Sequence, residues 1–416
     1  MAVPSNNGPM ESPKIAPLDP PDPRKQSVTP VRSYGGRVPE LDGLRGMAIL
    51  MVVIFHYLEE QGLVTGKGAT AILQRIVQMG WSGVDLFFVL SGFLIGGILM
   101  DARESPSYFR TFYARRFFRI IPIYYLWIFA YAILVGVAGS FLRAHSNSGV
   151  IQKPGGFAFS YFLFLQNCMV IPFAGFAGAW FGHLWSLAVE EQFYLISPLV
   201  VRILSGRHLV IFLGGVIVFA PLLRIMLLGM HVNSGLVSGM MPCRADSLAI
   251  GMLAALLWRQ EQFREWLSRR TGLLYAIFAA LFVGVAALWR WSPESQTRGM
   301  ETVGFTWLAL FYVVLLLLAL VRRDDPIARV ARISPLRRLG RISYCVYIIH
   351  LVVNVICHAL LRHAAPTTTD WRGAAVTIFA AFVTVAIAWI SWQLLEGPLV
   401  RFGHSFKYQS GGWPGL

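Results

Sequence analysis

The chain has 416 residues, of which 56% are hydrophobic and only 14% are charged, and its mean hydropathy is +0.58. Soluble domains carry about 25% charged residues, so this composition excludes a soluble enzyme, a disordered chain and a small disulfide scaffold. It indicates an all-α membrane protein with several crossings. The net charge of +15 fits basic cytoplasmic loops better than a nucleic-acid partner. The four cysteines lack metal-ligand spacing, which indicates buried thiols and no metal site.

The first part of the chain differs from the rest. Residues 1–40 hold nine of the 22 prolines, mixed charges and no long apolar run, a composition typical of disorder. We therefore expect a disordered cytosolic tail over 1–38, a transmembrane domain over 39–400 and a short cytosolic tail over 401–416. The apolar segments number eleven: 42–58, 82–100, 119–139, 157–176, 184–204, 209–230, 246–258, 273–291, 302–321, 342–361 and 373–395.

Basic loops predict the orientation of these segments. The arginine-rich loops 101–119, 202–207, 259–270 and 322–341 should all be cytoplasmic. Three apolar segments separate the first two of these loops, whereas two cytoplasmic loops require an even number of crossings. We therefore expect the segment 157–176, which is polar and broken by a proline, to be re-entrant or interfacial. The other ten should cross, with both termini in the cytosol.

Ionisable residues inside a membrane span are costly, so each is a candidate functional residue. In the first span, Arg45 and His56 are eleven residues apart, which is about three helical turns or roughly 16 Å. Both should lie on nearly the same face, with Arg45 near the cytosol and His56 in the outer half. Asp85 lies near the outer end of the second span, where it either serves a site or only favours the helix dipole.

Two further charged pairs occur within spans. Arg116 and Arg119 share one helical face at the cytoplasmic end of the third span, and guanidinium groups bind phosphates bidentately. Glu190 and Glu191 are adjacent, about two turns from the outer end of their span. At least one of these carboxylates should be protonated, paired or exposed to a polar cavity.

Weaker candidates lie toward the C-terminus. Arg244 and Asp246 open a short apolar segment and either serve the site or simply pair with each other. His350 follows Tyr344 and Tyr347 at helical spacing and is either a core histidine or part of a polar path. On these residues alone, the chain is either a transporter or an enzyme that takes a phosphorylated donor from the cytosol.

Five motifs, taken together, favour the enzyme. They are Leu41–Gly46 followed by His56, Gly83–Phe93, Arg116-x-x-Arg119, Trp185–Tyr194, and Arg244-Ala-Asp246, in that order. In this combination the chain strongly resembles the acyltransferase-3 family of membrane-bound O-acyltransferases over roughly residues 38–400. The resemblance implies ten crossings with cytosolic ends, in the inner (cytoplasmic) membrane. It also implies acylation of a cell-surface glycan such as lipopolysaccharide, or of a similar hydroxyl acceptor.

The resemblance also implies roles for residues. The family's Arg-x10-His pattern matches Arg45 and His56, and its Glu-x-x-Phe-Tyr pattern matches Glu190 and Tyr194. We expect acyl-CoA, and specifically acetyl-CoA, as a co-substrate, with no bound cofactor. Its phosphates should dock near three arginines, His56 should act as general base, and Glu190 or Asp85 should orient it, with an acyl-histidine intermediate as the variant route. The donor-binding arginines are Arg45, Arg116 and Arg119, and the supporting residues are Glu191, Tyr194, Arg244, Asp246 and His350.

Two other functions compete with this interpretation. A transporter or flippase would move an acyl or glycan-lipid substrate without forming an ester, and a glycosyltransferase would need larger extramembrane loops than this sequence offers. Some family members carry a C-terminal hydrolase-like domain, which we do not recognise here. We therefore expect transfer to be completed in the membrane or handed to a separate periplasmic protein.

Overall fold

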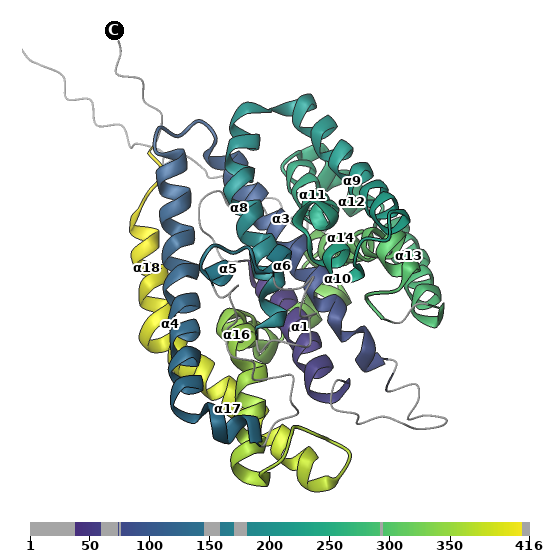
Figure 1. Ribbon diagram of the computed structural model, residues 1–416. Helices are drawn as coiled ribbons and strands as arrows, with labels where there is room; N and C mark the ends of the chain where they lie inside the picture. Colours follow the sequence, from purple (N-terminus) through teal and green to yellow (C-terminus); the bar gives the residue numbers. More distant parts are fainter. Residues whose placement is uncertain are drawn as a thin grey trace, which may run out of the picture.

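The computed structural model describes residues 38–59, 74, 76–144, 159–169, 181–291 and 294–409, and all regular secondary structure in these ranges is helical (Figure 1). The expected all-α fold is confirmed. The tail expected over 1–38 lies outside these ranges except for its last residue. The longer helices are α1 (Pro39–Ile54), α3 (Gly83–Ala102), α4 (Tyr108–Ala144), α8 (Trp185–Ile203), α9 (Gly206–Gly229), α11 (Met241–Trp258), α13 (Thr271–Trp291), α14 (Phe305–Val321), α16 (Ser334–Arg362) and α17 (Trp371–Ser391).

Shorter helical elements connect or extend these helices. Three of them are π-helical turns, which are rare in proteins and frequently occur at functional sites. The π-helical turns are η1 (Phe55–Glu59), η4 (Met300–Gly304) and η5 (Trp392–Glu396). The other short elements are η2 (Met79–Ser82), α5 (Phe159–Phe162), α6 (Gln166–Met169), η3 (Gly182–Leu184), α10 (Ser234–Gly239), α12 (Glu261–Arg269), α15 (Pro326–Ala331) and α18 (Gly397–Ser405).

Nine helical stretches of the described chain are long and apolar enough to cross a membrane. They coincide with nine of the ten expected crossings, so the chain is a multi-pass membrane protein. The tenth expected crossing, 184–204, coincides with α8, which has 19 residues but contains Glu190, Glu191 and Arg202. The nine stretches are Pro39–Leu58, Ile76–Ala102, Tyr108–Ala138, Gly206–Gly229, Ser234–Trp258, Thr271–Trp291, Met300–Val321, Ser334–Arg362 and Trp371–Ser405.

The described part of the segment 157–176 forms no continuous helix. It consists of α5 and α6, each four residues long, joined by a turn in which Phe164 has a φ of 53°. The side chain of Asn167 donates to the carbonyl of Gly239 at 3.2 Å and accepts from Gln192 at 3.0 Å. Contacts with α8 and α10 therefore satisfy polar groups of this short segment, which irregular backbone at membrane depth would require.

The helices divide into an inner and an outer group. In α3, α14 and α16 most side chains are buried, whereas α13 and α17 expose large apolar side chains such as Phe282 and Phe382. In Figure 1, α9 and α13 lie on one flank, and α4 runs beside α18 on the other. Exposed apolar faces of this kind are suited to contact with lipid.

The tightest helix contact joins α1 to α16 and α15. A Cβ atom at Gly340 would lie 1.8 Å from the carbonyl oxygen of Asp42, and one at Gly46 would lie 2.0 Å from that of Leu336. Gly43 is similarly close to Ala331. Small residues at membrane-helix interfaces allow such close backbone approach. The contact sets the position of α16 relative to α1, the helix that continues into the turn with His56.

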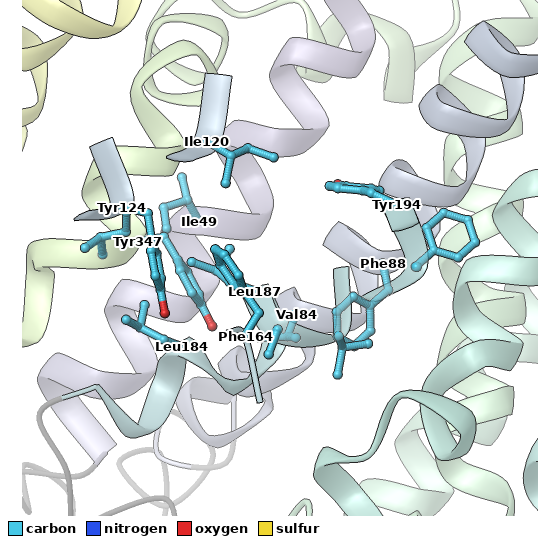
Figure 2. Close-up of a cluster of buried hydrophobic side chains, with 14 of the residues drawn as sticks. Ile49, Val84, Phe88, Ile120, Tyr124, Phe164, Leu184, Leu187, Tyr194 and Tyr347 are labelled. Carbon is cyan, nitrogen blue, oxygen red and sulfur yellow. The ribbon is translucent and has the colours of Figure 1, made fainter. Parts of the chain in front are cut away.

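A buried cluster lines the region between these two helices and α3, α4 and α8. Figure 2 shows Ile49 of α1, Phe88 of α3, Ile120 of α4, Leu187 of α8 and Tyr347 of α16 among its members. Within a bilayer such side chains stabilise the bundle by van der Waals packing against one another, because lipid is as apolar as they are. The cluster packs five helices together, and the arginines, glutamates and histidines nearest to it lie on the same five helices and the turns next to them.

The close contact at Gly340 predicts that a larger side chain destabilises the protein there but not at an open glycine. Gly340→Val should lower the melting temperature of the purified full-length protein in detergent, because overpacking costs about 1–3 kcal/mol or more when backbone is the neighbour. Gly215→Val is the matched control, since a Cβ built at Gly215 meets no atom within 4 Å apart from its chain neighbours and the backbone of its own helix. Equal melting temperatures for the two variants would contradict the close contact.

Candidate active site

Three arginines of α1 and α4 lie close to one another. Arg116 and Arg119 lie one turn apart on α4, and Arg45 of α1 is within electrostatic range of both. The guanidinium of Arg116 lies 5.9 Å from the ring centre of Tyr194. Within the described residues, the ion pairs of the chain involve other arginines. Three neighbouring guanidinium groups without a paired carboxylate form a surface suited to a polyanionic ligand.

A carboxylate borders this arginine cluster. Ser91 of α3 donates to Glu190 at 2.6 Å, and the hydroxyl of Tyr194 donates to the same carboxylate at 3.2 Å. Glu190 is within electrostatic range of Arg45 and Arg119. Glu191 is within range of Arg116 and of Glu190. The two adjacent glutamates thus lie beside the positive cluster, and this proximity offsets part of the cost of placing them within the helix bundle.

A group of three histidines lies near the other end of α1. His56 is on η1, His350 on α16 and His183 on η3, with ring centres 4.9 to 6.3 Å apart. Nδ1 of His56 lies 3.2 Å from Nε2 of His350. The hydroxyl of Tyr347 donates to the carbonyl of His183 at 2.6 Å. Sequence reasoning singled out His56 and His350 but did not assign His183 to the site.

The remaining predicted residues form a separate buried ionic network. Arg244 contacts Asp85 at 2.5 Å, and Arg224 contacts Asp246 at 3.0 Å. All four side chains are at most 2% exposed. The Arg244 guanidinium also lies 3.6 Å from the ring centre of Phe305, a cation–π contact. The network joins α3, α9, α11 and α14.

These contacts correct two expectations. Arg244 and Asp246 do not pair with each other, because each side chain reaches a partner on another helix. Asp85 pairs with Arg244, and Glu190 accepts hydrogen bonds from Ser91 and Tyr194, whereas Nε2 of His350 lies 3.2 Å from Nδ1 of His56. The pairing requires Arg224, which lies in the middle of an apolar run. An arginine within a span is itself a signal of a buried partner, but the sequence does not indicate which one.

The ionic network predicts a specific pattern of stability. Arg244→Met alone should destabilise the protein by about 3–5 kcal/mol, because Asp85 is left buried without its partner. The double variant Asp85→Leu with Arg244→Met should recover much of that loss, because it removes both charges. Thermal unfolding of the purified proteins measures the effect. A double variant no more stable than Arg244→Met would show that the pair does not explain the loss.

Comparisons with known proteins agree with the motifs. The chain is 26% identical to the peptidoglycan O-acetyltransferase OatA of Listeria monocytogenes over 388 residues, which cover 88% of this chain and 56% of that protein. It is also 26% identical to the O-acetyltransferase OatA of Staphylococcus aureus, covering 88% of this chain and 58% of that protein. The chain therefore spans little more than half the length of these relatives.

A further relative in Staphylococcus aureus, named as a putative O-acetyltransferase, is 24% identical over 382 residues and is covered to 58% of its length. No solved structure matches the chain significantly. The family model described as an acyltransferase domain matches residues 38–393, which is most of the chain and includes every candidate site residue. The chain belongs to the acyltransferase-3 family.

Proposed function

We propose that this protein is a membrane O-acetyltransferase that moves an acetyl group from cytosolic acetyl-CoA to a hydroxyl group of a cell-surface glycan. The observation that carries the proposal is the convergence of Arg45, Arg116 and Arg119 at one end of α1, with His56 at the other. Coenzyme A carries three phosphates, which suits a cluster of guanidinium groups. The relatives named as O-acetyltransferases support the same reaction.

The proposed orientation places the arginine end of α1 at the cytosolic side of the inner membrane, as the arginine-rich loops predict. Arg45 and His56 are eleven residues apart, and a helix of that length spans roughly 16 Å. An extended pantetheine arm can bridge such a distance. The phosphates would then remain near the cytosol while the thioester reaches the histidines in the outer half of the bundle.

The chemical step requires a base and a path for one proton. In the proposal, His56 takes the proton of the acceptor hydroxyl as its oxygen attacks the thioester carbonyl. The carbon–sulfur bond breaks, and the thiolate leaves with the proton returned by His56. The products are the acetyl ester and free coenzyme A. The acceptor is proposed to be a peptidoglycan or other envelope glycan, by analogy with the named relatives.

The function is tested on whole cells. Deleting the gene should remove base-labile acetyl groups from envelope glycans, as measured by mass spectrometry, and the wild-type gene should restore them. His56→Ala should fail to restore them, with a loss of at least about 100-fold, because general-base catalysis contributes that much. An unchanged set of glycan esters after deletion would favour transport or a small-molecule acceptor instead.

The matched control is His208→Ala, which removes an exposed histidine of α9. It should restore acetylation at the wild-type level when the two proteins are present in equal amounts. Acetylation that persists in His56→Ala would contradict the base role while leaving the overall reaction intact.

The donor site makes a separate kinetic prediction. Replacing Arg116 and Arg119 together by Gln should raise the acetyl-CoA concentration needed for half-maximal rate by about tenfold or more, because each charge-assisted hydrogen bond contributes about 1.5–3 kcal/mol. Release of coenzyme A thiol in proteoliposomes measures this. Arg110→Gln is the control, since Arg110 is exposed on the same helix. An unchanged dependence on acetyl-CoA would refute the assigned role.

A further inference from the structure

We propose that His350 is the positioning residue of His56: together with the carbonyl of Val52 it fixes the tautomer of the base, and it orients the ring by accepting a hydrogen bond from Nδ1. This inference rests on the proposed function and deepens it. It starts from one contact, 3.2 Å between Nδ1 of His56 and Nε2 of His350. The two residues are 294 positions apart in the sequence, on η1 and α16, so the contact is a product of the fold.

The backbone of α16 determines the tautomer of His350. Its Nδ1 lies 2.8 Å from the carbonyl oxygen of Tyr347 and 3.1 Å from that of Val346. Carbonyl oxygens only accept hydrogen bonds, so Nδ1 of His350 carries a hydrogen. In the neutral ring, Nε2 then holds the lone pair. The atom that faces His56 is therefore an acceptor.

The same reasoning determines the tautomer of His56. Its Nδ1 lies 2.9 Å from the carbonyl oxygen of Val52 and 3.2 Å from the acceptor Nε2 of His350. Both neighbours require a hydrogen on Nδ1, so the lone pair of neutral His56 is on Nε2. Nε2 is thus the atom that can take a proton from an acceptor hydroxyl. The group hydrogen-bonded to the other ring nitrogen sets this choice.

His350 is held firmly enough to orient another ring. Its side chain is fully buried. The hydroxyl of Tyr57, the residue next to His56, reaches back to the carbonyl of His350 at 2.7 Å and lies 3.0 Å from the hydroxyl of Thr384. His56 and His350 are therefore joined both by their rings and by the neighbouring tyrosine. This double attachment fixes the relative position of η1 and α16 at the base.

Three other polar side chains of the site lie on neighbouring elements. His183 of η3 faces His350 with ring centres 5.0 Å apart, and the Tyr347 hydroxyl bonds to the carbonyl of His183 and to Ser186. The carboxylates of Asp85 and Glu190 are engaged by Arg244 and by Ser91 and Tyr194. The ring of His350 lies against Nδ1 of His56, the side of the base at which a carboxylate lies in many hydrolase triads.

The role of His350 in the step follows from proton bookkeeping. When His56 Nε2 takes the hydroxyl proton, the ring becomes a cation with hydrogens on both nitrogens. The Nδ1 hydrogen remains shared between the carbonyl oxygen of Val52 at 2.9 Å and Nε2 of His350 at 3.2 Å, and both acceptors stabilise the cation. When the thiolate leaves, His56 Nε2 gives up its proton and the pair returns to its starting state. No net proton is stored, and no further reactant is needed.

The test compares two replacements of His350 in the cells that lack the native gene. His350→Leu removes the acceptor and should lower envelope acetylation by about 10- to 100-fold, the usual effect of losing an orienting partner. His350→Gln places an amide oxygen where Nε2 was and should recover most of that loss. Both proteins are matched for abundance in the membrane, and the melting temperature of each is measured after purification.

His358 provides the control on the same helix. It is also fully buried, and its Nε2 lies 2.9 Å from the hydroxyl of Thr377. His358→Leu should lower the melting temperature but leave acetylation per folded molecule near the wild-type level. A decrease equal to that of His350→Leu would show that loss of any buried histidine of α16 is sufficient, and would overturn the proposal.

The remaining outcomes separate this inference from the function on which it rests. If His350→Gln melts normally but is as inactive as His56→Ala, an acceptor at this position is not what His56 needs, and the proposal fails. If His350→Leu keeps full acetylation while His56→Ala loses it, only the positioning role is lost. If deletion of the gene changes no glycan ester, the proposed function fails first. Should His350→Leu not fold, the activity and melting of His350→Gln decide the matter.

Discussion

The arrangement of the candidate site depends on the backbone contact between α1 and α16. Gly46 of α1 and Gly340 of α16 each lie against a carbonyl of the other helix, at distances that leave no space for a side chain. In a bilayer, helix association relies on such close packing, because lipid is as apolar as the side chains. The contact sets where α16 runs relative to α1. It thereby brings His350 against His56 at the far end of the pair.

A second constraint is the cost of charge in an apolar medium. Four buried side chains reduce this cost by forming ion pairs, Arg244 with Asp85 and Arg224 with Asp246. Among the described residues, Arg45, Arg116 and Arg119 take part in none of the ion pairs, although Glu191 and Glu396 lie within electrostatic range of Arg116 and Arg119. The difference separates paired charge from charge that is suited to a ligand, and Asp85 belongs to the paired network through its contact with Arg244.

Much of the fold could be predicted from sequence, because hydropathy and arginine-rich loops are local signals. The sequence also identifies Arg45, His56 and Glu190 as candidate site residues, since an ionisable residue within a span stands out against its neighbours. The partner of each buried polar side chain could not be predicted from the sequence. The pairing of Arg244 with Asp85 and the approach of His350 to His56 depend on how distant helices pack. No periodicity within one segment carries that information.

His56 belongs to a π-helical turn, η1, which continues α1. A π turn contains one more residue than an α-helical turn, so it rotates everything beyond it by about 100° relative to a regular helix. The direction of the His56 ring therefore depends on the number of residues in this turn as well as on which residues they are. Loss or gain of a single residue in η1 would change the direction of the His56 ring without changing any side chain. The number of residues between Arg45 and His56 is therefore itself constrained, and substitutions that keep the chain length would not reveal this constraint.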